Sequence, residues 1–257
     1  MRFIKYFWYL KTYLSLSKIV SNWYDIFFQA LGINSNPNFT LYLKSGEEFK
    51  LTHFKDSPVL SENWQLDIYH LRQLHRPKTI IDIGAYVGDF SIMAAKLFPG
   101  SNIYAFEPAP DSYHCLLVNI LANSVTNINP FSIAVTDKNG QQQLFDTGPG
   151  GQRSLNPTPK SSKPFKVQTQ TLSWIFNSLK ISTCDLLKMD SEGAEYEILF
   201  STPPDIFKKI KRIALEFHDR PFGDHNGLIE LLSRLGYHTL IQYHPVEGDI
   251  GMLYAWH

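Results

Sequence analysis

The sequence predicts an α/β fold built on a doubly wound, mostly parallel sheet, and three observations support this prediction. From Lys78 onward, short apolar segments alternate with segments of helical period, which is typical of parallel strands joined by helical crossovers. The first strand ends in a glycine-containing turn, where sheets of this kind bind their ligands. The length of 257 residues fits one large domain, 78–257, preceded by an extension, 1–77.

The extension begins with an aromatic stretch, residues 1–32, that reads as a helix with one apolar face. Charged residues interrupt it, so no segment approaches the ~20 apolar residues that a membrane span needs. The interruption at Lys11 and the lack of a clear small-residue cleavage site also argue against a secretory signal peptide. We expect this helix to pack on the main domain; peripheral contact with a membrane, or a homodimer contact, are the alternatives.

A hairpin and a second helix complete the extension. Apolar residues alternate on both sides of the Ser45-Gly46 turn in the segment 39–52. Residues 59–75 then follow a helical period, with Ser61 as a candidate N-cap.

The elements of the main domain follow in order. Strands are predicted in TIIDIG, NIYAFEP and INPFSIAV, with helices at 88–98 and 110–122 between them. QQQLFDT and KVQTQTLSWI are predicted as further strands, the second of which leads into a short helix. In the rest of the domain, strands are predicted in CDLLKMD and KRIALEFH, and helices in GAEYEILF and at 225–235. The chain ends in two further strands, HTLIQYH and GMLYAWH, which we expect to pair antiparallel.

The net charge and the cysteine content limit the classes of function that the protein can have. Lys+Arg and Asp+Glu both number 24, so the overall charge argues against nucleic acid as a partner. The two cysteines, Cys115 and Cys184, have apolar neighbours and no metal-ligand spacing, which is typical of reduced thiols in a cytoplasmic protein.

The turn after the first strand has the pattern Asp82-x-Gly84-x-x-x-Gly88. In the dinucleotide fingerprint a glycine stands where this chain has Asp82, and a carboxylate there would repel a phosphate. An acid at this place suits a cationic ligand, such as the sulfonium and amino group of S-adenosylmethionine. The second strand ends in Glu107, an acid placed to accept both hydroxyls of a ribose. An NAD-dependent oxidoreductase is therefore the weaker alternative.

Five segments, DIGAYVGDFS, YAFEP, SIAVTD, LLKMDSEGAEYEIL and LEFH, resemble in this order the FkbM-like family of S-adenosylmethionine-dependent methyltransferases. The resemblance covers about residues 78–257, and Ser191 stands where the family often has Val or Cys. It implies a class I (Rossmann-like) methyltransferase fold with a seven-stranded sheet and helices on both faces. It also implies O-methylation of a hydroxylated small molecule, a sugar or a natural product. The cofactor-binding residues that we infer from these segments are Asp82, Gly84, Ala85, Gly88, Glu107, Pro108, Ala134 and Asp190.

Three ionisable residues, Asp190, Glu216 and His218, end the fourth and fifth core strands and are expected to meet at one edge. Orientation of the acceptor oxygen supplies most of the catalysis of methyl transfer, and a general base adds ~10²–10⁴-fold. We expect His218 to be this base, because its unperturbed pKa of ~6.5 suits neutral pH. Asp190 or Glu216 would orient it or bind the acceptor. A divalent metal held by the same three residues is an alternative that we do not favour.

Further acidic residues follow Asp190. Glu192 is assigned to the edge of the site, where it would bind the acceptor. Glu195 and Glu197 are assigned mainly to the start of the next helix, where the helix dipole favours acids.

A loop rich in Gly and Pro, residues 147–165, is predicted at the crevice, and loops of this length are often lids. Arg153 and Ser154 would then lie over the acceptor, and Arg153 would suit an acidic or polyhydroxylated substrate. A plain surface loop is an equal alternative. An alternative of another class is a protein that binds the cofactor without turnover and is anchored by its N-terminus. The intact set of ionisable strand-end residues argues against this alternative.

Overall fold

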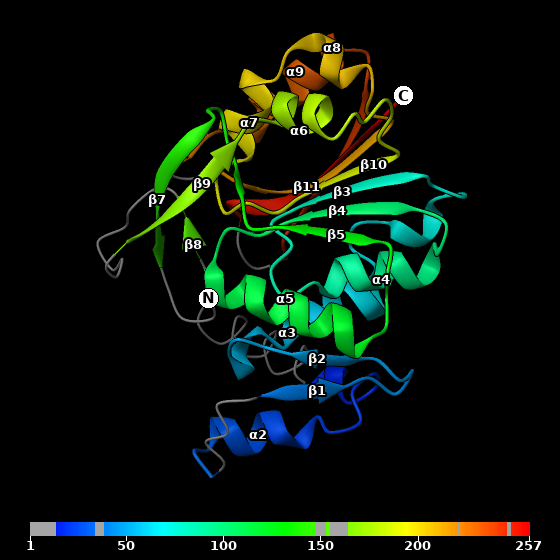
Figure 1. Cartoon of the computed structure of the whole chain (residues 1–257), viewed down its shortest axis with the longest axis vertical. Helices are drawn as coiled ribbons and strands as arrows, with labels where there is room; N and C mark the ends of the chain where they lie inside the picture. Colours follow the sequence, from blue (N-terminus) through cyan, green and yellow to red (C-terminus); the bar gives the residue numbers. More distant parts are fainter. Residues whose placement is uncertain (1–13, 34–38, 147–152, 155–163, 220–221, 246–247) are drawn as a thin grey trace.

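A seven-stranded sheet in the order β12-β13-β11-β10-β3-β4-β5 forms the centre of the computed structural model (Figure 1). The structure describes residues 14–33, 39–146, 153–154, 164–219, 222–245 and 248–257. The strands of the central sheet are β3 (Thr79–Ile83), β4 (Asn102–Phe106), β5 (Ile128–Phe131), β10 (Leu186–Met189), β11 (Arg212–His218), β12 (His238–Tyr243) and β13 (Ile250–Trp256).

Strand pairing in this sheet is parallel from β5 through β4, β3 and β10 to β11, and antiparallel where β13 joins β11 and β12. The predicted mostly parallel, seven-stranded sheet with an antiparallel final pair is therefore confirmed. The inner strands are apolar on both faces because each face is covered. Ile80 packs into one apolar cluster and its neighbour Ile81 into the other.

Helices cover both faces of the sheet, as Figure 1 shows. The face that also carries the N-terminal extension has α4 (Asp89–Leu97) and α5 (Pro110–Ala122). The opposite face has α6 (Leu172–Ser178), α7 (Glu195–Ser201), α8 (Pro204–Phe207) and α9 (His225–Arg234). Side-chain caps fix two of the helix starts, because Thr171 accepts a hydrogen bond from the Trp174 N–H and Asp224 accepts one from the Asn226 N–H.

A second, smaller sheet stands beside the carboxyl edge of the first. Its strands, in the order β6-β9-β7-β8, are β6 (Ala134–Val135), β7 (Gly140–Asp146), β8 (Arg153–Ser154) and β9 (Phe165–Gln170). The single strand predicted in INPFSIAV is wrong, because the chain leaves the main sheet after Phe131 and β6 pairs with β9 instead. The strands predicted in QQQLFDT and KVQTQT are confirmed as β7 and β9. Most of the predicted loop 147–165 lies outside the described residues.

The extension packs on α5 through a hairpin. Its elements are α2 (Tyr24–Ala30), β1 (Thr40–Tyr42), β2 (Glu48–Lys50), the 3-10 turns η1 (Phe54–Asp56) and η3 (Leu71–Gln73), α3 (Pro58–Leu60) and the π-helical turn η2 (Ser61–Leu66). The predicted hairpin is confirmed, with Leu41 opposite Phe49. Buried Asn119 bonds to both backbone groups of Lys50, which fixes the hairpin to the main domain.

The continuous helix predicted over 59–75 is wrong. The chain breaks after η2 at Asp67, whose φ is 53°, and the Asp67 carboxylate accepts hydrogen bonds from the N–H groups of Leu71 and Arg72. Beyond this break, the Tyr69 hydroxyl donates to Asp190 Oδ2 at 3.2 Å. The irregular segment thus brings the extension to the end of β10.

Part of the aromatic N-terminal helix predicted for residues 1–32 lies outside the described residues, namely 1–13. The described remainder contains a short helical turn at residues 14–16 and the helix α2. None of the helices that the structure describes is long and apolar enough to cross a membrane.

Candidate functional site

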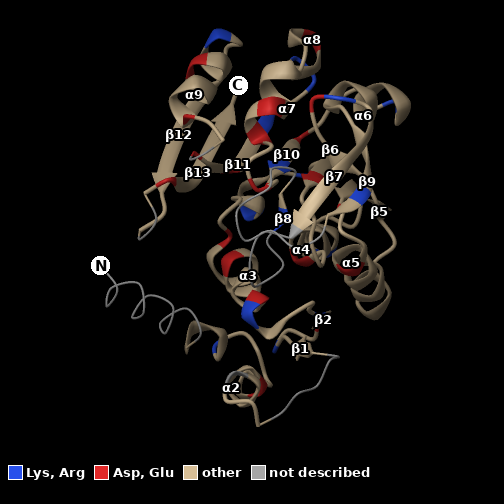
Figure 2. Ribbon diagram, turned by 90° about the vertical axis from the view of Figure 1, so that its left-hand side faces the viewer, with Lys and Arg blue, Asp and Glu red and all other residues tan. Residues whose placement is uncertain are grey.

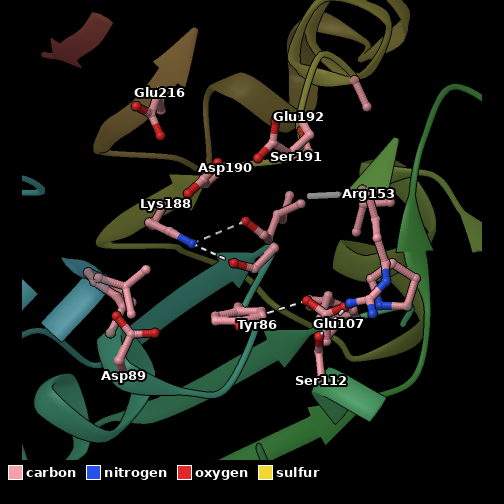
Figure 3. A pocket seen from close by; sticks show the side chains of 18 of the residues that line it. Tyr86, Asp89, Glu107, Ser112, Arg153, Lys188, Asp190, Ser191, Glu192 and Glu216 are labelled. Carbon is pink, nitrogen blue, oxygen red and sulfur yellow. Dashed lines mark hydrogen bonds between the residues drawn. The ribbon is translucent and has the colours of Figure 1, made fainter. Parts of the chain in front are cut away.

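A cavity of about 500 Å³ opens at the carboxyl ends of β3, β4, β10 and β11 (Figure 3). Its volume is in the range of small-molecule sites. Among the described residues, acids outnumber bases in its walls. The acids are Asp56, Glu62, Asp89, Glu107, Asp190, Glu192 and Glu216, and the bases are Lys55, Arg153 and Lys188.

The predicted site residues divide into those that line this cavity and those that do not. The lining residues are Gly84, Glu107, Pro108, Ala134, Arg153, Asp190, Glu192 and Glu216. The residues outside the lining are Asp82, Ala85, Gly88, Ser154 and His218. Gly88 is favoured by its backbone conformation, because its φ of 88° is one that residues with a side chain rarely adopt.

Asp82 does not reach the cavity, in contrast to the expectation that it would contact a cationic cofactor. It is fully buried, accepts a hydrogen bond from Ser91 Oγ at 2.6 Å and pairs with Lys188 Nζ at 3.0 Å. Burial alone would lower the pKa of Lys188, but the Asp82 and Asp190 carboxylates outweigh burial and raise this pKa. The Lys188 ammonium, which also donates to the Gly84 carbonyl at 2.7 Å, is the cation that Asp82 holds.

The turn after β3 requires glycine for close packing. Gly84 has a φ of 75°, and a Cβ at this position would lie 1.7 Å from the backbone oxygen of Asp190. Next to it, the Tyr86 N–H donates to Glu107 Oε2 at 2.8 Å, and the Ala109 N–H donates to Oε1 at 2.8 Å. Two backbone groups therefore fix the orientation of the Glu107 carboxylate in the cavity wall.

Glu107 fits the role of a ribose ligand, because its carboxylate is held in place and lines the cavity. Burial raises the pKa of Glu107 to about 7, although the N–H groups of Ala109 and Tyr86 oppose the shift. The acidic walls suit a ligand with sulfonium and ammonium charges. The residues present thus fit S-adenosylmethionine, through Glu107 at one end and the carboxylates beyond Gly84 at the other.

The segment after β10 folds into a tight loop. Glu192 and Gly193 both have positive φ, 52° and 102°, and this reversal turns Glu195 inward. Glu195 is fully buried and accepts hydrogen bonds from the Ser191 and Gly193 N–H groups at 2.7 and 2.9 Å. Glu195 stands in the first turn of α7 as predicted, but its main contacts are with this loop and with His218, so its assignment to the helix alone is corrected. Glu197 stands in the same first turn, as predicted.

His218 lies between two carboxylates. Its Nδ1 is 3.5 Å from Glu195 Oε1 and its Nε2 is 3.6 Å from Glu192 Oε2, so both contacts are electrostatic and neither is a well-formed hydrogen bond. Burial would lower the pKa of His218, but Glu195, and after it Glu192 and Glu216, outweigh burial and raise the pKa well above its ordinary value. The surrounding carboxylates therefore favour the protonated form of the ring. A favoured positive charge on the ring argues against the expected role of His218 as the base.

The pKa of Glu195 is lowered, which fits this arrangement. Burial would raise it, but His218 and the Ser191 N–H lower it below its usual value. Glu195 is thus ionised and holds the charged His218 ring.

The far end of the cavity carries carboxylates with few partners (Figure 3). Tyr69 donates to Asp190, whereas no described residue forms a hydrogen bond or ion pair with the side chain of Glu62 or Glu216. Burial, and then Asp190 and Asp89, raise the pKa of Glu62 to about 7. Burial and Asp190 also raise the pKa of Glu216 well above its usual value, with His218 opposing. This end favours a ligand that is neutral or positively charged.

Arg153 lines the cavity, but on the Glu107 side, and Ser154 does not line it. Arg153 Nη2 pairs with Asp111 Oδ2 at 2.5 Å and Nη1 donates to Ser112 Oγ at 2.9 Å, so β8 is tied to the start of α5 on the Glu107 side (Figure 3). Ser154 is buried and its Oγ donates to the Glu192 carbonyl at 3.1 Å. These strands close the cavity wall and fix the Glu192 loop.

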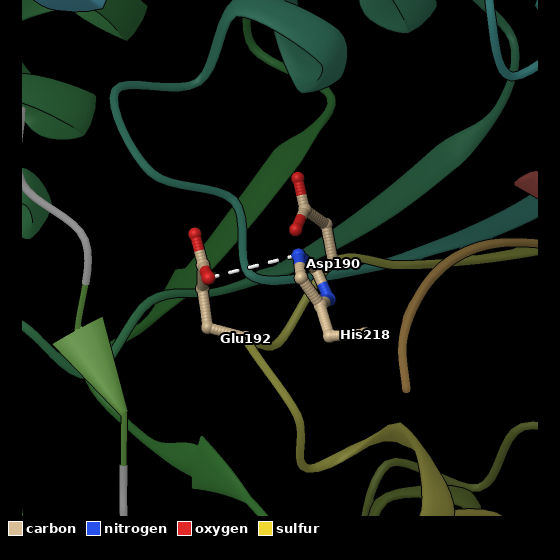
Figure 4. Close-up of side chains that lie close together, drawn as sticks. All are labelled: Asp190, Glu192 and His218. Carbon is tan, nitrogen blue, oxygen red and sulfur yellow. Dashed lines mark ion pairs between the residues drawn. The ribbon is translucent and has the colours of Figure 1, made fainter. Parts of the chain in front are cut away.

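Asp190, Glu192 and His218 each offer a ligand atom, and these atoms lie within 4.8 Å of one another (Figure 4). In this arrangement Glu192, and not Glu216 as predicted, would be the third member of a cation site. A metal must bind the neutral imidazole, and the raised pKa of His218 opposes this. Among the described residues, the short distances between these ligand atoms are therefore the one feature of the geometry that favours a divalent metal at this place.

Among the lining residues that sequence reasoning missed are Glu62, Tyr69 and Lys188. Lys188 carried a usable signal, because a lysine inside an otherwise apolar strand needs a buried partner. Glu62 and Tyr69 carried none, because the chain breaks the helical period between them.

Comparisons with known proteins agree on one class. A model of the methyltransferase FkbM domain matches residues 82–239. The chain is 22% identical over 240 residues to the 31-O-demethyl-FK506 methyltransferase FkbM of Streptomyces tacrolimicus, covering 80% of this chain and 92% of that one. It is 23% identical over 197 residues to the 2-O-methyltransferase NoeI of Sinorhizobium fredii, covering 69% and 80%. A match to the AMB antimetabolite synthetase AmbE of Pseudomonas aeruginosa, 23% identical, covers 66% of this chain but spans only 10% of that protein.

Proposed function

Because the chain belongs to the FkbM family of S-adenosylmethionine-dependent methyltransferases, we propose that it methylates a hydroxyl oxygen of a small polyhydroxylated acceptor, a sugar or a natural product. Two relatives whose names specify O-methylation support the oxygen as acceptor atom. The observation that carries the proposal is that one cavity has Glu107 at one end and Asp190, Glu192 and Glu216 at the other.

At the first end, Glu107 would accept hydrogen bonds from the ribose hydroxyls of the cofactor, because the backbone N–H groups of Tyr86 and Ala109 keep its carboxylate oriented. Ala134 and Pro108 form the adjoining wall. When bound, S-adenosylmethionine supplies an electrophilic methyl group on a sulfonium. The surrounding carboxylates favour that positive charge.

At the other end of the cavity, Glu192 acts as the general base. Burial raises its pKa to about 7, with His218 opposing and Asp190 assisting, and a base near neutral pKa is effective at physiological pH. The Glu192 carboxylate would accept the proton of the acceptor O–H, which leaves the oxygen free to take up the methyl group that the bound cofactor would supply. Charged His218 keeps Glu192 in place through the 3.6 Å contact. Asp190, held by Tyr69, orients the acceptor hydroxyl.

The charge of the cavity walls limits the chemical classes of acceptor that can bind. Asp190 and Glu192 would repel an anionic acceptor, and Arg153 is engaged by Asp111 near the Glu107 end. A neutral polyol or an acceptor with an amino group fits, and the acidic substrate considered for Arg153 does not.

The test is methyl transfer from radiolabelled S-adenosylmethionine to a panel of neutral, amino-bearing and carboxylate-bearing sugars and polyketide alcohols. We expect label in ether-linked methyl groups of neutral or amino-bearing members, and none in the carboxylate-bearing ones. Label that is transferred to nitrogen or to a carboxylate would contradict the proposal.

A further inference from the structure

Large apolar side chains are exposed along α2 and the residues that flank it. Phe27, Leu31 and Ile33 have relative exposures of 60%, 59% and 69%. We define the aromatic face as the exposed residues Trp23, Tyr24, Phe27, Phe28, Leu31 and Ile33. A contiguous apolar surface of this kind on a folded domain marks an interaction site.

The other side of the same segment is fixed to the hairpin. Ile26 is buried, with 5% exposure. The Asn22 side chain accepts a hydrogen bond from the Tyr42 N–H and donates one to the Thr40 carbonyl, both at 2.9 Å. The aromatic face therefore stays in solvent because the opposite side of α2 is the one that packs.

The charge of this region differs from that of the whole chain. In the sequence, residues 1–33 contain four basic residues, Arg2, Lys5, Lys11 and Lys18, and a single acidic one, Asp25; of the basic residues, Lys18 lies among the described ones. The Asp25 carboxylate is engaged by the Asn22 side chain at 2.9 Å. A protein interface core is depleted of lysine, whereas aromatic residues together with basic ones suit an anionic lipid surface.

We propose that the aromatic face binds peripherally to the surface of an anionic lipid bilayer. Trp and Tyr prefer the headgroup region and the neighbouring aliphatic side chains reach the acyl boundary. Figures 1 and 2 show α2 at the end of the molecule, beyond the β1–β2 hairpin and away from the main sheet. A bilayer at this end leaves the carboxyl edge of the sheet accessible to acceptor and cofactor.

The experiment is vesicle flotation of the full chain with vesicles of phosphatidylcholine alone and of phosphatidylcholine mixed with phosphatidylserine. We expect the wild-type protein to float with the mixed vesicles, and less so as salt is added. The double variant Phe27→Ser, Leu31→Ser should lose roughly tenfold or more in vesicle partitioning, because both side chains lie on one helical face.

The matched control is the double variant Leu66→Ser, Leu121→Ser, which removes leucines with exposures of 64% and 78% from outside the aromatic face. It should float as the wild type does, and circular dichroism verifies that both variants are folded. The proposal is overturned if the wild type floats with neither vesicle or if the Phe27/Leu31 variant floats normally. A dimer that this variant abolishes, without vesicle binding, identifies a second copy of the chain as the occupant and also overturns it.

Discussion

Replacing Lys188 with methionine is expected to lower the free energy of unfolding by about 3–5 kcal/mol. The substitution preserves most of the side-chain volume but leaves the Asp82 carboxylate, which has no exposure, without its cation. It also removes the hydrogen bond to the Gly84 carbonyl and the contact of the ammonium with the Tyr69 ring, 5.2 Å from its centroid. Urea titration followed by circular dichroism measures the loss.

Two companion variants separate the buried charge from general damage. Adding Asp82→Asn to Lys188→Met removes the unpaired charge, so part of the stability should return. Lys211→Met breaks a pair of similar length, 2.7 Å to Asp185, but Lys211 is 62% exposed, and we expect a loss below about 1 kcal/mol. Equal losses for Lys188→Met and Lys211→Met would show that Asp82 does not depend on Lys188.

Replacing Glu192 with glutamine is expected to reduce kcat by roughly 10²–10⁴-fold on an acceptor found in the panel, because the acceptor proton then has no base. The affinity for S-adenosylhomocysteine should stay unchanged, since Glu192 lies at the far end of the cavity from Glu107. The pKa of Glu192 is about 7, so wild-type kcat should rise as the pH rises through that value and level off above it. The Glu192→Gln variant should show no such rise.

Glu197→Gln is the matched control, since Glu197 stands in the same segment but does not line the cavity. It should keep the wild-type rate and pH profile. If Glu192→Gln turns over normally while His218→Gln does not, the assignment of the base to Glu192 is wrong and His218 is the base after all.

The sequence located the strand ends well, because strand and helix periods are local signals. Glu107, Asp190 and Glu216 were predicted at the carboxyl ends of three parallel strands, and all three line one cavity. Parallel strands that end at one edge bring their terminal residues together whatever the details of packing. This part of the site therefore follows from the order of the elements.

The failures concern contacts between strands and reversals of the backbone. Asp82 was assigned to the cofactor, but the register of β3 and β10 places Lys188 directly opposite it, and no local pattern reveals register. The positive φ of Glu192 turns Glu195 inward, and this reversal brings the Glu195 carboxylate to 3.5 Å from His218 Nδ1, where it raises the pKa of the ring. The extension reaches the site through Tyr69, which follows a break in the chain after η2. The apolar residues of 59–75 keep a helical period across this break, so the sequence does not reveal it.

The central claim is that this cavity binds S-adenosylmethionine through Glu107, and isothermal titration with S-adenosylhomocysteine tests it most directly. We expect saturable binding to the wild type, no binding of NAD, and a loss of about tenfold or more in affinity for Glu107→Ala, because hydrogen bonds to a charged partner are removed. The account is contradicted if S-adenosylhomocysteine produces neither heat nor a shift in Tm, or if Glu107→Ala binds it as tightly as the wild type.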